Sequence, residues 1–81
     1  MEIALLYFSA ARQLTKKDGE RLQFAAGASV GEVVSALERK YSGLKDMRRQ
    51  MRFSVNEQFV DTATALKEGD ELALIPPSSG G

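Results

Sequence analysis

Apolar and polar residues alternate with the two-residue period of β-strands in several short stretches of the chain. The first stretch, residues 2–8, is apolar on both faces, which predicts a central strand. A second stretch places Leu22 and Phe24 inward between polar neighbours, as expected of a half-exposed strand near a sheet edge. The last three strands are separated by turn residues. The predicted strands cover residues 2–8, 20–24, 51–55, 58–60 and 71–75.

A helical period interrupts this strand pattern once. Ser29 and Glu32 have the spacing of a capping box, in which each side chain accepts a hydrogen bond from a backbone N–H at the helix start. Gly43 is placed to end the helix in the left-handed conformation. The apolar face of this amphipathic helix consists of Val30, Val33, Val34, Leu37 and Tyr41.

The segments between these elements carry turn signals. Asp18-Gly19 is a dipeptide that supplies the positive φ angles of a tight hairpin. Asn56-Glu57 predicts a second turn, and residues 10–14 are expected to form one turn of helix that is too short to be stable alone. Residues 44–50 are polar and basic and are expected to form a loop.

This order of elements predicts an α+β domain, with one main helix across one face of a mixed sheet. The two end strands are the most apolar, so we expect them side by side and parallel in the centre. Alternation then directs Ile3, Leu5, Tyr7, Leu72 and Leu74 toward the helix. The opposite face receives Leu6, Phe8, Ala73 and Ile75, which Phe59 can join. Either this face docks another protein, or part of it closes a second small core under the loop at residues 45–50.

Composition limits the chemistry of the chain. Its 81 residues suffice for one domain, and 11 basic residues balance 11 acidic ones. This balance removes the electrostatic attraction that drives non-specific nucleic-acid binding, so we expect no nucleic-acid partner. Without Cys or His, the commonest nucleophile, general base and transition-metal ligands are missing. No apolar stretch approaches a membrane span, and the start lacks a signal-peptide pattern, so we expect a cytoplasmic protein without a membrane partner.

The last six residues carry the remaining reactive group. We divide the chain into a domain over residues 1–75 and a flexible tail over residues 76–81, which reaches about 20 Å when extended. Gly80 and Gly81 have no side chain, so a narrow channel of another protein can admit the terminal carboxyl group. A partner that converts this carboxylate into a mixed anhydride would expose it to attack by sulfide or an amine. The alternative is an inert, frayed terminus.

The chain closely resembles the small subunit of molybdopterin synthase, the MoaD-type sulfur carriers with a ubiquitin-like β-grasp fold. The resemblance spans essentially the full chain and depends most on its end. Its anchors are residues 7–12, the Ser29-led helix, Val55-Asn56 and residues 69–81. Family members usually have a branched apolar residue where this chain has Ser78. We expect this departure to alter how the tail binds its partner and to leave the carboxyl chemistry intact.

The resemblance implies a reaction sequence at Gly81. An activating enzyme (MoeB-type) adenylates this residue with ATP, the product becomes a thiocarboxylate, and the tail inserts into the large synthase subunit (MoaE-type). Two such sulfurs build the dithiolene of molybdopterin. The carrier itself binds no cofactor or metal. The implied partner contacts are Phe8, Arg12, Phe59, Ile75, Pro76, Pro77, Ser78 and Ser79.

Several alternatives stay open at this point. The carrier can serve thiamin or cysteine synthesis, act as a ubiquitin-like modifier conjugated through Gly81, or be an interaction domain with an inert tail. Arg12 either forms a charge-assisted hydrogen bond to a carboxylate of a partner or is a solvated surface residue. The basic cluster of Arg48, Arg49 and Arg52 is expected in a solvated loop, although it can meet an acidic partner. We interpret Asp70-Glu71 as residues of a turn and a strand edge and not as a metal site.

Overall fold

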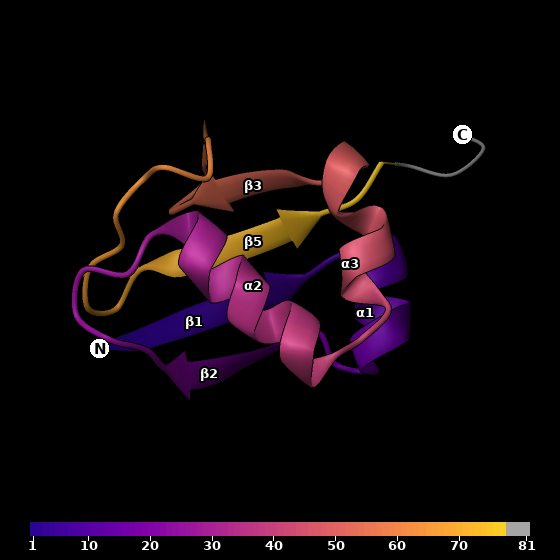
Figure 1. The fold of residues 1–81 in the computed structure, drawn as a ribbon, viewed down its shortest axis with the longest axis horizontal. Helices are drawn as coiled ribbons and strands as arrows, with labels where there is room; N and C mark the ends of the chain where they lie inside the picture. Colours follow the sequence, from indigo (N-terminus) through magenta and orange to yellow (C-terminus); the bar gives the residue numbers. More distant parts are fainter. Residues whose placement is uncertain (78–81) are drawn as a thin grey trace.

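The computed structural model describes residues 1–77, which form a five-stranded mixed sheet with helices on one of its faces (Figure 1). The strand order is β2-β1-β5-β3-β4. The elements are β1 (Glu2–Tyr7), α1 (Ser9–Thr15), β2 (Gly19–Gln23), α2 (Val30–Lys40), α3 (Leu44–Met47), the 3₁₀ helix η1 (Arg48–Gln50), β3 (Arg52–Val55), β4 (Gln58–Val60) and β5 (Glu71–Ile75). As predicted, β5 pairs in parallel with β1, while its other neighbour, β3, is antiparallel.

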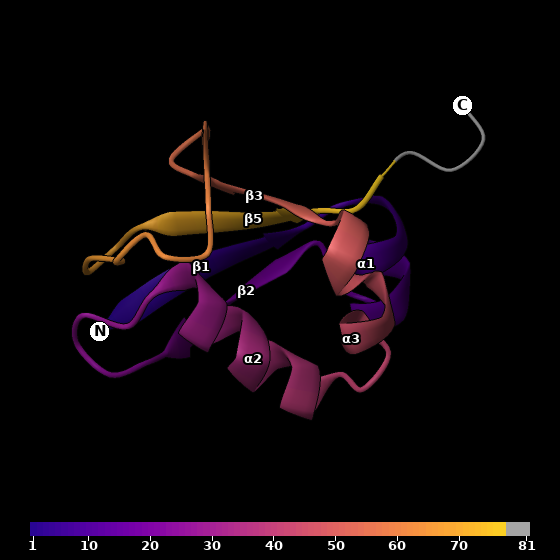
Figure 2. The ribbon, with the colours of Figure 1, turned by 45° about the horizontal axis from the view of Figure 1, so that its top comes forward.

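The core lies between the sheet and α2. Figure 2 shows α2 and α3 on the same side of the sheet, with the opposite face turned away from them. The five strand residues predicted to face the helix are at most 2% exposed, and the helix contributes four buried side chains. Two-residue alternation in the strands and helical spacing in α2 therefore predicted the core correctly. None of the helices formed by residues 1–77 has the length and apolar character that a bilayer crossing requires.

The start of α2 has the predicted capping box. The Glu32 backbone N–H donates to Ser29 Oγ at 3.1 Å, and the Ser29 N–H donates to Glu32 Oε1 at 2.9 Å. The predicted end of this helix is wrong, because Gly43 has φ −73° and the helix already ends at Lys40. A Cβ at position 43 would lie 2.8 Å from Leu14 Cδ1, so glycine provides close packing here.

The prediction of a tight hairpin at Asp18-Gly19 is also wrong. α1 fills the connection between β1 and β2, and Lys16, with φ 62°, is the left-handed residue that ends this helix. Gly19 lies within β2, where a Cβ would overlap the carbonyl oxygen of Leu5 on the neighbouring strand. The predicted turn at Asn56-Glu57 is confirmed, since both residues have positive φ between β3 and β4.

Residues 44–50 form α3 and η1, not the loop that we expected. Leu44 is buried, and Met47 packs against the core. Arg48 Nη1 donates to Glu38 Oε1 on α2 at 3.1 Å and to Ser35 Oγ at 3.3 Å. These contacts hold the segment on the helix side of the sheet, so it cannot close a second core over the opposite face.

Candidate functional site

The helix-free face of the sheet carries a row of small and apolar residues across four strands. The register pairs Leu6 with Ala73, Ala73 with Ser54, and Ser54 with Phe59. Ala73 and Ser54 are buried within the row, whereas the Phe59 side chain on the edge strand β4 is 67% exposed. The row therefore ends in a large aromatic ring that is mostly exposed.

A second row begins where β1 and β5 end. Tyr7 pairs with Leu74, and the Phe8 N–H donates to the Leu74 carbonyl oxygen at 3.2 Å, so Phe8 continues the extended chain beside Ile75. Phe8 is 43% exposed and Ile75 is half-buried. We call Leu6, Phe8, Phe59, Ala73 and Ile75 the apolar face. The structure thus brings the three predicted docking residues onto one surface, as alternation indicated.

Strand β5 ends at Ile75, which belongs to this apolar face. Pro76 is buried and Pro77 is exposed, so packing within the domain extends through Pro76. The predicted partner residues Ser78 and Ser79 and the reactive Gly80 and Gly81 lie outside the described residues.

The predicted basic residues occupy three different settings. Arg12 lies on α1 and forms an exposed ion pair with Asp18 at 3.7 Å, a type of contact that contributes little to stability. Arg48 is bound to α2, Arg49 is exposed, and Arg52 lies on β3 with its guanidinium 5.8 Å from the centre of the Phe59 ring. The expected cluster is therefore only partly solvated, because Arg48 is half-buried against α2, although it lines one groove together with Arg52.

Asp70 closes the predicted turn after Lys67, and Glu71 is the first residue of β5. The Asp70 carboxylate accepts hydrogen bonds from the Asn56 side-chain amide and the Lys67 N–H, both at 2.9 Å. The Glu71 N–H donates to Asn56 Oδ1 at 3.0 Å. These bonds connect the β3–β4 turn to the start of β5.

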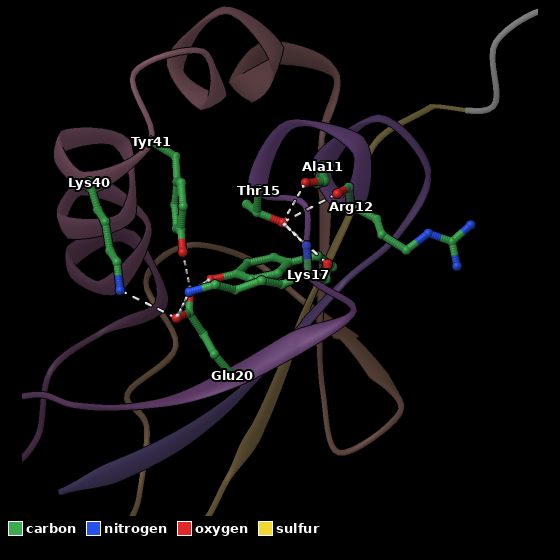
Figure 3. A network of polar contacts seen from close by, with 8 residues as sticks. Ala11, Arg12, Thr15, Lys17, Glu20, Lys40 and Tyr41 are labelled. Atoms are coloured by element: carbon green, nitrogen blue, oxygen red, sulfur yellow. Dashed lines mark hydrogen bonds and ion pairs between the residues drawn. The ribbon is translucent and has the colours of Figure 1, made fainter.

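Four donors converge on Glu20 in a network that the sequence did not reveal (Figure 3). Glu20 Oε2 accepts from the Tyr7 hydroxyl at 2.7 Å and from the Tyr41 hydroxyl at 2.6 Å, while Oε1 pairs with Lys17 at 2.9 Å and Lys40 at 3.3 Å. Tyr7 and Tyr41 were both predicted to face the core, and a buried tyrosine hydroxyl requires a polar partner. This requirement was the feature of the sequence that could have indicated a buried polar network.

The network fixes the charge of Glu20. Burial alone would raise the pKa of this carboxyl group, but hydrogen bonds from Tyr41, Tyr7 and the two lysines outweigh it and lower the pKa to about 2. Burial raises the pKa of Tyr7, and the bond to Glu20 raises it further. The carboxylate therefore joins β1, β2 and the end of α2 at neutral pH.

Glu20→Gln is expected to lower the free energy of unfolding at pH 7 by about 2–3 kcal/mol, because the pKa of Glu20 falls from 4.5 to about 2 on folding. Because the pKa of Glu20 is lowered in the folded state, its carboxylate contributes its full stabilisation of the fold above pH 4.5. This contribution is lost as the pH falls toward 2. Urea unfolding between pH 2 and 7 should show a smaller loss of stability in the variant than in the wild type.

Glu57→Gln, in the exposed β3–β4 turn, is the matched control for this experiment and should retain the wild-type pH dependence. Equal slopes of stability against pH in Glu20→Gln and the wild type would show that the network does not hold the carboxylate charged.

Comparisons with known proteins agree on the fold and on the length of the domain. The model of the ThiS family matches residues 5–81. The molybdopterin synthase sulfur carrier subunit of Mycobacterium tuberculosis is 33% identical, and the alignment covers 100% of this chain and 99% of that protein. The human protein of the same name is 31% identical, with coverage of 99% and 94%.

Solved structures show the same architecture. SAMP1 from Haloferax volcanii superimposes with a TM-score of 0.86 at 24% identity, covering 100% of both chains. The complex of subunits 1 and 2 of molybdopterin-converting factor from Helicobacter pylori contains a similar chain, with a TM-score of 0.71, 24% identity and full coverage of both chains. The predicted ubiquitin-like β-grasp fold is therefore confirmed.

Proposed function

The chain belongs to the ThiS family, and from this membership we propose that it is the sulfur carrier subunit of a cytoplasmic molybdopterin synthase. The proposal is supported by relatives of that name that match over the full chain at 30–33% identity. The observation that carries it is the position of β5. This strand ends beside an apolar face on which Phe8 and Phe59 are exposed.

The proposed chemistry takes place at the Gly81 carboxyl group. The carboxylate attacks the α-phosphorus of ATP in an activating enzyme, which forms an acyl adenylate and releases pyrophosphate. A sulfur nucleophile then displaces AMP, and the resulting thiocarboxylate donates its sulfur to the dithiolene of molybdopterin. Hydrolysis of the acyl group returns the carboxylate. The carrier thus supplies an acyl group, while its partners supply the catalytic residues.

The described residues serve this reaction by docking. Phe8, Phe59 and Ile75 would be buried against the large synthase subunit, which brings the tail to the entrance of its channel. Arg12 is exposed beside the same end of the sheet and would bond to a carboxylate of the partner. The activating enzyme, which must also receive the tail, would use an overlapping surface.

Intact-mass spectrometry of protein purified from its own cells tests the proposal. A thiocarboxylate adds the mass difference between sulfur and oxygen to a fraction of the chains, and incubation with the large subunit and precursor should remove it. Species heavier by whole proteins would instead indicate a modifier conjugated to lysine. If neither form appears when an activating enzyme, ATP and a sulfur source are supplied, the proposed function is wrong.

A further inference from the structure

Arg52 places a positive charge inside the apolar face. It pairs with Ile75 across β3 and β5, and its guanidinium carbon lies 5.8 Å from the centre of the Phe59 ring. The contact with the Phe59 ring shows that the Arg52 side chain lies on the apolar face. The cation is therefore next to two of the proposed docking residues, Phe59 and Ile75. Any protein that covers Ile75 and Phe59 must therefore also cover Arg52.

Arg52 has no carboxylate partner among residues 1–77. The cations that form ion pairs in this part of the chain are Arg12, Lys17, Lys40 and Arg48. The acidic residue opposite Arg52, one position beyond the Phe53–Val60 pair, is Asp61. Its Oδ1 accepts from the Ala63 N–H at 2.9 Å, within its own turn. The guanidinium donors of Arg52 thus remain available to a docked protein.

A groove of about 500 Å³ adjoins the guanidinium. Half of its lining residues are apolar, namely Met51, Phe53, Phe59 and Val60, and the other half are Arg48, Arg52, Asp61 and Thr62. A groove of this kind fits apolar side chains of a partner, while the neighbouring guanidinium fits a carboxylate. The combination is more specific than an apolar surface alone.

We propose that Arg52 selects the docking partner by requiring an Asp or Glu carboxylate among the apolar side chains that cover Phe59 and Ile75. Docking removes water from the guanidinium, and a cation buried without a partner is costly. A carboxylate restores charge-assisted hydrogen bonds in the bidentate geometry that arginine favours. Arg52 therefore favours an acidic partner surface and disfavours a wholly apolar one.

This inference rests on the proposed function, because it takes the large synthase subunit as the partner. The dissociation constant of the purified chain with that subunit should be measured at low and high ionic strength. We expect Arg52→Leu to weaken binding about 30-fold or more and to reduce its dependence on salt. Arg52→Lys retains the charge but not the planar fork, so it should bind with intermediate affinity.

Arg39→Leu is the matched control, because it removes the same charge from an exposed position on α2, far from the apolar face. It should bind like the wild type, and thermal unfolding should show that all variants remain folded. Wild-type affinity and salt dependence in Arg52→Leu would overturn this inference alone. If the wild-type chain neither binds the large subunit nor acquires sulfur, the proposed function fails, and the inference fails with it.

Discussion

A chain that lacks Gly81 is expected to fold like the full protein and to transfer no detectable sulfur. Its new terminal carboxyl, on Gly80, would be about 3.3 Å short of the reacting position in an extended tail. A misplacement of about 1 Å can already cost two orders of magnitude in rate, so transfer should fall below detection. Thiocarboxylate formation is measured by intact mass, with purified activating enzyme, ATP and a sulfur source.

The fold provides the control for this deletion. The described core is complete within residues 1–76, so the midpoint of thermal unfolding should not change. Gly81→Ala keeps the length of the tail and adds only a methyl group. The amount of thiocarboxylate formed on this variant therefore distinguishes an effect of a narrow channel from an effect of a shortened tail. Wild-type loading of the shortened chain, or loss of its folded state, would contradict the assignment of Gly81.

The regular elements were predictable because burial imposes a period on the residues that form them. The alternation in β1 and β5 identified both faces of the central strands, and the capping box identified the start of α2. Parallel pairing of the end strands followed from short antiparallel connections elsewhere and a helix in the middle. These inferences need only the local sequence and general rules of topology.

The errors arose where a residue serves a neighbour that is distant in sequence. Gly19 makes room for the Leu5 carbonyl and Gly43 makes room for Leu14, whereas local rules assigned Gly19 to a hairpin turn and Gly43 to a helix end. Residues 44–50 are helical although they are polar, because Leu44 is buried and Arg48 binds Glu38. Such contacts depend on how the elements pack, which a single sequence does not specify.

The candidate site shows the same division. Alternation placed Ile75 and Phe59 on one face, but the isolation of Arg52 depends on the register of β4 and on the turn that engages Asp61. The carboxylate of Glu20 looked like an ordinary edge-strand residue. Two of its four donors, Lys40 and Tyr41, reach it only when α2 packs across β1 and β2.

Phe8→Asp is expected to weaken docking to the large subunit by about 2–4 kcal/mol, which is roughly 30- to 1,000-fold in the dissociation constant. The substitution replaces an apolar anchor by a carboxylate that the interface would have to bury. The fold should tolerate it, because Phe8 is 43% exposed and occupies the N-cap of α1, a position where aspartate is favoured. Titration calorimetry measures the affinity.

Gln13→Asp is the matched control, since it adds the same charge at an exposed position on α1 without altering the apolar face. Calorimetry should give wild-type affinity for this variant and a loss only for Phe8→Asp. The comparison separates removal of an anchor from a general effect of negative charge near the end of the sheet. Equal affinities in the two variants would place the docking surface elsewhere, because a folded carrier that docks through Phe8 cannot bury an unpaired carboxylate there without loss.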